Sequence, residues 1–247
     1  MVKTKPQVAI VGFGRFGQTL YRLIKDDFII NIYDAKKINR HDLAKDTQVL
    51  TKVADVYNSP TIFYCVPIPK FESVIKAHKK YFKDHLLIDV LSVKMHPAKV
   101  FKKYLKGTKA HALLTHPMFG PDSSQNGFAG LPIMIDKFTA SSKAYAKWKK
   151  YFKNKKLRVV ELSAEEHDRL AAYSQGIAHF VGRLLDEIGM KPTPIDTMGT
   201  RKLNEMREQI GHNTWELFVG LQNYNPHAKE MRRRFGQAYQ KLCKKLR

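Results

Sequence analysis

The chain has 247 residues, of which 43% are hydrophobic and 11% aromatic, which excludes a chain that is disordered throughout and allows one large or two modest domains. No apolar run reaches the roughly 20 residues of a membrane span, and no apolar leader follows Met1, so we expect a cytoplasmic protein. The two cysteines, Cys65 and Cys243, exclude a disulfide framework and lack partners at zinc-ligand spacing, so we expect no metal.

The charge is strongly basic, because 44 Lys and Arg face 22 Asp and Glu, for a net charge of +22. Such a balance fits a nucleic-acid partner or a small anionic substrate. The lysines are spread along the chain in pairs, and the basic groups Arg232–Arg234 and Lys244–Lys245 fit a solvated last helix as well as a binding surface. The motifs described below argue against a specific nucleic-acid function.

The first part of the chain alternates apolar, strand-like runs with helical stretches. We expect strands at 8–11, 28–33, 61–66, 86–90, 110–114, 131–135 and 157–161, and helices at 17–25, 71–82, 97–105 and 141–152. Apolar strands that alternate with helices indicate a parallel sheet covered on both faces. Residues 1–162 are therefore predicted to form a Rossmann-like dinucleotide-binding domain.

The pattern becomes entirely helical after Ser163. A long helix is expected over about 164–188, where apolar residues recur at spacings of three and four, and Lys191–Pro194 ends it. Further helices are expected at about 196–209, 213–224 and 226–246. The predicted fold class is thus α/β, with the Rossmann-like domain followed by an all-α domain over 163–247.

A Gly-x-Gly-x-x-Gly motif directly follows the first strand and opens the first helix. The first glycine permits the tight turn, the second lets the backbone approach a pyrophosphate, and the third lets helix and strand pack closely. The candidate cofactor-binding residues are Gly12, Phe13, Gly14, Arg15, Phe16 and Gly17, with Val66 and Pro67 at the end of the third strand.

An acidic residue, Asp34, ends the second strand about 20 residues after the motif begins. A carboxylate at this place binds the adenosine ribose hydroxyls and repels the 2′-phosphate of NADP, so NAD is the favoured cofactor. Lys36 and Lys37 follow and would serve a 2′-phosphate if Asp34 turned away, so NADP stays open. Asp34 can also act as a loop-capping carboxylate.

Polar residues also fall at strand ends and in the long helix. Ser92 and His116 follow the strands that end near Val90 and Thr115, and His179 lies within the long helix. Each has an ordinary structural interpretation by itself, as a turn cap, a loop histidine or a core histidine. Four segments in this order make the pattern more specific: Asp89–Lys94, Thr115–Pro121, Glu166–Arg169 and Ser174–His179.

These segments resemble the prephenate/arogenate dehydrogenases of tyrosine biosynthesis, especially the short plant-like branch. The resemblance implies oxidative decarboxylation of a cyclohexadienyl substrate, with hydride transfer to a nicotinamide, and a homodimer formed through the helical domain. It implies that His116 is the catalytic base and that Ser92 binds the same hydroxyl or orients the histidine. It also implies substrate binding by Thr115, Gln175 and His179.

The substrate assignment depends on Asn213 and on the group that holds the ring carboxylate. The plant-like arogenate enzymes carry an aspartate at the position of Asn213, and a neutral amide suits a keto acid better than an ammonium, so prephenate is favoured over arogenate. Asn213 can also be a helix N-cap. The arginine that many bacterial relatives use aligns with Met206, next to Arg207, and Arg183 is another candidate for the ring carboxylate.

A related dehydrogenase class is disfavoured by the long helix. β-Hydroxyacid dehydrogenases typically rely on a lysine there, and no lysine occurs between Ala164 and Met190. The expected function is therefore a prephenate dehydrogenase that uses NAD, with an NADP-dependent arogenate dehydrogenase as the alternative.

Overall fold

The computed structural model describes residues 5–246. The sequence-based expectation that no leader is present concerns the chain start, which lies outside the described residues. It separates into two compact units, Met1–Ala164 and Glu165–Arg247. Among the described residues, each helix is too short or too polar to span a bilayer.

The first unit is built on one eight-stranded sheet in the order β3-β2-β1-β4-β5-β6-β7-β8. Its strands are β1 (Gln7–Val11), β2 (Ile29–Tyr33), β3 (Gln48–Val49), β4 (Thr61–Tyr64), β5 (Leu86–Asp89), β6 (His111–Pro117), β7 (Pro132–Asp136) and β8 (Arg158–Glu161). The six strands from β3 to β6 form the parallel part, and β8 is parallel to β7. The Rossmann-like fold class expected from the sequence is confirmed.

The strands differ from the expectation at two places. β7 runs antiparallel to β6, with Leu114 opposite Asp136, because the chain between them contains only a short 3₁₀ turn and no crossover helix. The two-residue strand β3 was not expected, because Gln48–Val49 is too short to show a pattern in the sequence.

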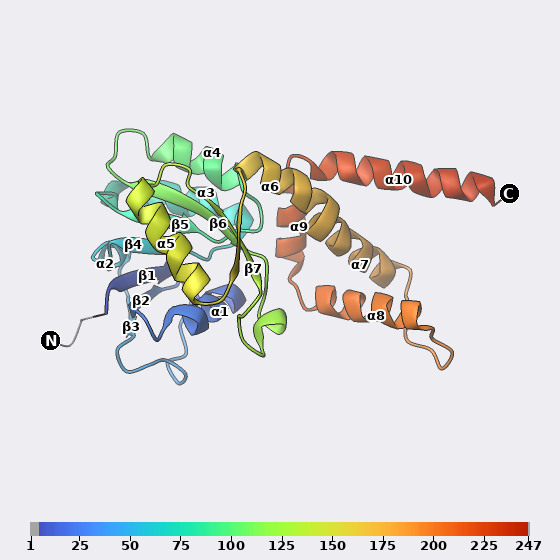
Figure 1. Ribbon diagram of the computed structural model, residues 1–247, viewed down its shortest axis with the longest axis horizontal. Helices are drawn as coiled ribbons and strands as arrows, with labels where there is room; N and C mark the ends of the chain where they lie inside the picture. Colours follow the sequence, from blue (N-terminus) through green and yellow to red (C-terminus); the bar gives the residue numbers. More distant parts are fainter. Residues whose placement is uncertain (1–4, 247) are drawn as a thin grey trace. The chain divides into compact units, whose positions relative to one another are not determined.

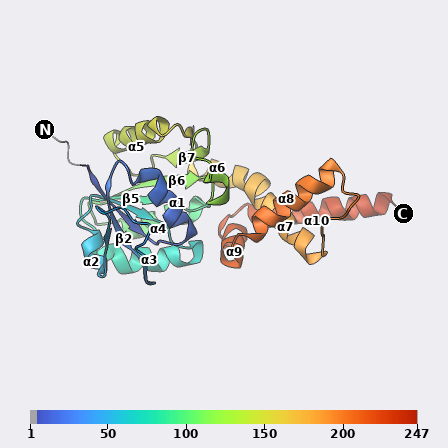
Figure 2. The same cartoon turned by 90° about the horizontal axis from the view of Figure 1, so that it is seen from below.

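Helices cover both faces of the sheet, as Figures 1 and 2 show. α1 (Arg15–Ile24) and α5 (Ser142–Asn154) contribute to one apolar core, in which Trp148 stacks on Phe28 at 5.5 Å between ring centroids. α2 (Val53–Val56), α3 (Phe71–His78) and α4 (Met95–Tyr104) lie on the other face, where Phe71 and Phe101 meet edge to face. The sheet is therefore buried on both faces.

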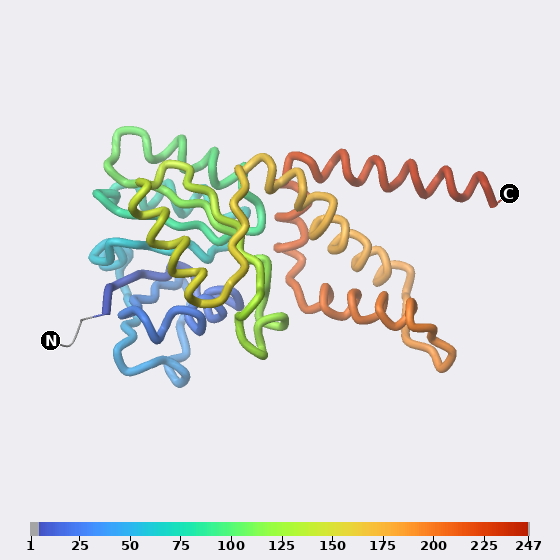
Figure 3. Tube along the Cα trace, viewed as in Figure 1, coloured from blue at the N-terminus to red at the C-terminus, as the bar shows by residue number. Residues whose placement is uncertain are grey.

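The second unit is helical. After α6 (Ala164–Ala171), which begins at the boundary, come a π-helical segment (Ala172–Gly176), α7 (Ile177–Glu187), α8 (Met198–Gly211), α9 (Trp215–Tyr224) and α10 (Ala228–Lys245). Figure 3 follows the chain from α7 through the connection at 188–197 into α8. The single helix expected over 164–188 is thus interrupted by a π-helical segment, whose extra residue per turn leaves no mark in the spacing of apolar residues.

Close packing of α7 on α8 depends on Gly182. A Cβ atom at this position would lie 2.7 Å from Cδ1 of Ile210, so a larger side chain would force the Ile210 side chain to move. Thr197 caps α8, since its side chain accepts a hydrogen bond from the Thr200 N–H. Thr214 caps α9 in the same way, so the alternative role of Asn213 as the N-cap of this helix is wrong.

Candidate active site

The glycine loop joins β1 to α1 with the geometry that the sequence predicts. Gly12 has φ +94°, and a Cβ atom there would lie 2.6 Å from the Cys65 carbonyl oxygen. A Cβ atom at Gly17 would lie 2.2 Å from the Gly12 carbonyl oxygen, whereas one at Gly14 would meet nothing within 4 Å. Two glycines are therefore needed for packing, and Gly14 leaves open space beside the first turn of α1, as a bound pyrophosphate requires.

The other candidate cofactor residues surround this loop. Val66 lies two residues after the end of β4, and its Cγ1 lies 3.2 Å from the position of a Cβ atom at Gly12. Pro67 is exposed beside it. Burial raises the pKa of the Cys65 thiol far above its usual range, so this cysteine is an inert part of the turn. The loop and its surroundings fit a dinucleotide.

Asp34 supports the glycine loop. Its Oδ2 accepts a hydrogen bond from the Phe13 N–H at 2.6 Å, and its Oδ1 accepts one from the Lys36 N–H at 2.7 Å. The carboxylate therefore fixes both the loop and the turn after β2, which is the loop-capping role that the sequence left open. Its expected contact with ribose hydroxyls stays a prediction.

Arg15 and its neighbour Phe16 face the segment that follows His116. Arg15 forms an ion pair with Asp122 at 3.3 Å, and Phe16 packs on Phe119 with their ring centroids 6.3 Å apart. These two contacts hold the start of α1, next to the glycine loop, against the loop that follows β6.

The two candidate catalytic residues lie at the ends of neighbouring strands. Ser92 is half-buried, three residues after the end of β5. His116 is 2% exposed and lies within β6, opposite Met134 of β7, and does not follow the strand as the sequence predicts. The strand is longer than expected because pairing with β7 extends it to Pro117.

Thr115 is held by the adjacent strand. Its hydroxyl donates to the Asp89 carbonyl oxygen at 2.6 Å, and its N–H donates to Asp89 Oδ1 at 3.3 Å. The side chain is completely buried. Its predicted contact with substrate is untested, and in this structure its hydroxyl ties β6 to β5 directly before His116.

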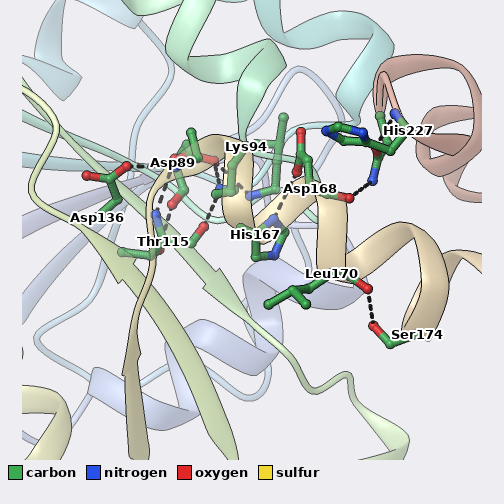
Figure 4. A network of polar contacts seen from close by, with 12 residues as sticks. Asp89, Lys94, Thr115, Asp136, His167, Asp168, Leu170, Ser174 and His227 are labelled. Carbon is green, nitrogen blue, oxygen red and sulfur yellow. Dashed lines mark hydrogen bonds and ion pairs between the residues drawn. The ribbon is translucent and has the colours of Figure 1, made fainter.

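A buried ion pair at this point was not found from the sequence (Figure 4). The Lys94 ammonium contacts both the Asp89 carboxylate and the Thr115 carbonyl oxygen, and neither charged side chain is exposed. Burial raises the pKa of Asp89 to about 6, although Lys94 and two backbone N–H groups act to lower it. Lys94 belongs to a segment that the sequence singled out, but burial of a lysine depends on partners that only the fold brings together.

The helical unit has its own polar arrangement around α6. His167 Nδ1 lies 2.9 Å from Asp168 Oδ1, and both side chains are buried (Figure 4). Asn225 donates from Nδ2 to the Asp168 carbonyl oxygen at 2.8 Å. The Glu166–Arg169 segment therefore has a structural function in fixing the helices of this unit.

Gln175 and His179 present buried polar atoms that have no hydrogen-bond partner among the described residues, namely Oε1 of Gln175 and Nδ1 of His179. Gln175 lies in the π-helical segment, and such segments are frequent at functional sites. Burial, with a contribution from nearby Arg183, lowers the pKa of His179 to about 4, so its imidazole is neutral at pH 7. Buried unpaired polar atoms are costly, so a ligand or water that pairs with them would be stabilised there.

The arginines considered for the ring carboxylate are engaged within the unit. Arg183 donates to the Asn213 carbonyl oxygen at 2.6 Å and lies over the Trp215 ring at 5.8 Å. Arg207 pairs with Asp186 at 3.2 Å. The Asn213 amide donates to the Gln209 carbonyl oxygen at 3.4 Å, so its side chain lies at the end of α8.

Comparison with known proteins agrees with this architecture. The family described as "Prephenate dehydrogenase, nucleotide-binding domain" matches residues 23–161, more than half of the chain, and "TYRAAT1-like, C-terminal domain" matches residues 184–247. The glycine loop lies ahead of the first match, so its assignment rests on the geometry given above.

Two relatives are arogenate dehydrogenases 2 and 1, chloroplastic, of Arabidopsis thaliana. Each is 33% identical over 97% of this chain, and the chain spans 70% of the first relative and 39% of the second. A crystal structure of prephenate dehydrogenase from A. aeolicus, in complex with hydroxyphenyl propionate and NAD+, has the same fold, with a TM-score of 0.72 at 17% identity over 99% of this chain and 91% of that one.

The fold and the glycine loop define an NAD(P)-dependent dehydrogenase. The chain belongs to the prephenate/arogenate dehydrogenase family. The family resemblance inferred from the sequence motifs is confirmed.

Proposed function

We propose that the chain catalyses the NAD(P)-dependent oxidative decarboxylation of arogenate. The observation that carries the dehydrogenase site in this proposal is the shared direction of β1, β4, β5 and β6. Because parallel strands end at the same edge of a sheet, the glycine loop, Val66, Ser92 and His116 all lie at that edge. A glycine loop suited to a dinucleotide and a buried histidine thus lie at the same edge of the sheet, which supports the proposal.

His116 is proposed to take the proton of the substrate's 4-hydroxyl, with Ser92 hydrogen-bonded to the same oxygen. A neutral imidazole is suited to this role near pH 7. The bound nicotinamide supplies the acceptor for the hydride that leaves the hydroxyl-bearing carbon. Loss of that hydride and of the ring carboxylate as carbon dioxide leaves an aromatic ring, and the substrate is oxidised by two electrons. Gln175 and His179 are proposed to bind the substrate through their unpaired atoms.

The identity of the substrate's side chain separates two candidates. Arogenate is supported by the names of both Arabidopsis relatives, which match 97% of this chain. Prephenate is the second candidate, and Asn213 favours it, because a neutral amide offers no charge to the ammonium of arogenate. Reduction of NAD and NADP should be followed with each substrate, and Asn213→Asp should shift the preference towards arogenate if this residue contacts the side chain.

The catalytic assignment is tested by His116→Gln. We expect kcat to fall by roughly 10²- to 10⁴-fold, the usual contribution of a general base, while dinucleotide binding is unchanged. His111→Gln is the matched control, because His111 is an exposed residue at the start of the same strand. Equal activity of His116→Gln and the native protein would contradict the assignment.

The proposal also covers the oligomeric state of the protein. We propose a homodimer formed through the helical unit, where Ile188, Leu203 and Trp215 expose large apolar side chains. Light scattering should give twice the mass of the chain.

The enzyme is proposed to work in the cytoplasm without a nucleic-acid partner, although both Arabidopsis relatives are named as chloroplastic. Imaging of a tagged protein and titration with unrelated DNA test these two points.

A further inference from the structure

The π-helical segment Ala172–Gly176 is bracketed by two side-chain hydrogen bonds from the carboxyl end of α9. Gln222 donates from Nε2 to the Gly176 carbonyl oxygen at 2.9 Å. Asn225 donates from Nδ2 to the Asp168 carbonyl oxygen at 2.8 Å, ahead of the segment. Both amide side chains are buried. The backbone is therefore held from α9 on both sides of the π-helical turn.

Arg232 fixes the orientation of the Gln222 amide. Its Nη1 donates to Oε1 of Gln222 at 2.8 Å and to the Gln222 carbonyl oxygen at 3.0 Å. A guanidinium has donors and no acceptor, so the amide oxygen faces Arg232 and the amide nitrogen faces Gly176. Without Arg232 the amide would be free to turn over, and its oxygen would then meet the Gly176 carbonyl oxygen, which is also an acceptor. Arg232 thus selects the orientation in which Gln222 binds the segment.

The next arginines of α10 also have partners within this unit. The Arg234 guanidinium lies 5.8 Å from the centroid of the Tyr173 ring, which belongs to the π-helical segment. Arg233 and Arg234 both pair with Glu230, at 2.6 and 2.8 Å. The basic group Arg232–Arg234, which in the sequence fits a binding surface or a solvated helix, is therefore engaged within the chain, and two of its members act on one segment.

The segment positions two residues of the proposed substrate site. Gln175 directly precedes Gly176, and His179 follows it by about one helical turn. Oε1 of Gln175 and Nδ1 of His179 are buried without a hydrogen-bond partner among the described residues. A π-helical turn contains one residue more than an α-helical turn, so conversion to an α-helix would rotate the residues on its two sides by about 100° relative to one another. The directions of both side chains consequently depend on contacts that keep the π-helical turn in place.

We propose that Gln222 and Arg232 are positioning residues, which hold the π-helical segment so that Gln175 and His179 face the substrate. The inference rests on the proposed function, because that function assigns the unpaired atoms of Gln175 and His179 to the substrate. Neither positioning residue touches the substrate itself. Their effect is on substrate binding, and dinucleotide binding by the glycine loop is independent of them.

The first test is Gln222→Glu, followed by steady-state kinetics with arogenate and prephenate. The carboxylate still accepts from Arg232, but it offers the Gly176 carbonyl an oxygen in place of a donor. We expect the KM for substrate to rise roughly tenfold, the cost of one lost buried hydrogen bond, while kcat falls less than about threefold and the dinucleotide Kd is unchanged. Gln237→Glu is the matched control, because it makes the same change at an exposed position of α10.

Two substitutions of Arg232 separate its hydrogen bonds from the space that it fills. Arg232→Met removes both donors and should raise KM about tenfold, whereas Arg232→Lys retains donors for the Gln222 oxygens and should stay within about threefold of the native KM. Arg233→Met is the control, because Arg233 is exposed and pairs with Glu230. Thermal unfolding is measured for every variant, so that a general loss of folding is recognised by a fall in Tm and in kcat together.

A measurement without substrate distinguishes this inference from the proposed function. Amide hydrogen exchange of the full chain, read by mass spectrometry, should be about tenfold faster at residues 172–179 of Gln222→Glu than in the native protein, and unchanged in α8. If the native protein turned over neither arogenate nor prephenate, the proposed function would be refuted. The exchange rates would still decide whether Gln222 and Arg232 hold the segment.

Three results would overturn the proposal. An unchanged KM in an active Gln222→Glu variant would show that the segment is held without the amide. Unchanged exchange at residues 172–179 would show the same without reference to substrate. A fall in Tm with no change in KM, in both Gln222→Glu and Arg232→Met, would show that the two residues only stabilise the helices.

Discussion

Removal of the Lys94 ammonium should destabilise the first unit through the charge that it leaves behind. In Lys94→Met the Asp89 carboxylate, which is fully buried in the native structure, loses the ammonium with which it is paired. Breaking a buried pair on one side costs about 3–5 kcal/mol, because the remaining charge is desolvated without compensation. A methionine of similar length fills most of the space, so packing contributes little to the loss.

The pH dependence of this loss identifies its cause. Burial already raises the pKa of Asp89 to about 6, and removal of Lys94 raises it further. A folded-state pKa above the unfolded value means that the native form binds the additional proton, so stability falls as the pH rises through the interval between the two values. The loss in Lys94→Met should therefore be large at pH 8 and smaller at pH 5.

Urea titration in a Trp215→Phe background measures this loss. Trp148 is then the remaining tryptophan, and it is buried in the first unit. Lys103→Met is the matched control, because Lys103 forms an exposed ion pair with Glu72 and its removal should leave the free energy of unfolding unchanged. A loss below about 1 kcal/mol for Lys94→Met, or one that is the same at pH 5 and pH 8, would refute the reasoning.

Other substitutions test the loop, the helical unit and the buried histidines. Gly14→Ala should keep the native circular dichroism but lower the dinucleotide affinity measured by calorimetry, since the new Cβ atom enters the open space beside the first turn of α1. Gly182→Val should lower the free energy of unfolding of the helical unit by about 1–3 kcal/mol, measured by Trp215 fluorescence, because it overlaps Ile210. The free energy of unfolding should fall between about pH 6.5 and 4, because burial lowers the pKa of His78 and of His179 to about 4 and the unfolded chain takes up their protons first. His78→Gln should flatten that curve in urea titrations, and an unchanged slope would contradict the pKa argument.

The glycine loop could be predicted from the sequence because its requirements are local. Gly12 must adopt a positive φ, and Gly17 must approach the backbone of the same turn. Most strands of the sheet were predicted for a similar reason, since strands buried on both faces are continuously apolar. β3 was missed, because a two-residue strand has no pattern. β7 was predicted as a strand but not its direction, which depends on the segment that joins it to β6.

The candidate site residues also differ in whether they depend on neighbouring residues or on distant parts of the chain. Residue types at strand ends pointed to Ser92 and His116, because the end of a parallel strand is where such folds place ligands. Their surroundings were not visible in the sequence. Asp89 is the partner of Lys94, and the two are brought together by a turn and by the adjacent strand β6.

By itself, the sequence determined the family, the alternation of strands and helices, and the glycine turn, since each depends on the periodicity or stereochemistry of neighbouring residues. Only the tertiary structure decided the direction of β7, the burial of Lys94 and the contacts of Asp34. These depend on pairs such as Phe13 and Asp34, which are far apart in the chain. The free energy of a buried charge or hydrogen bond is set by its partner, and chain folding is what supplies that partner.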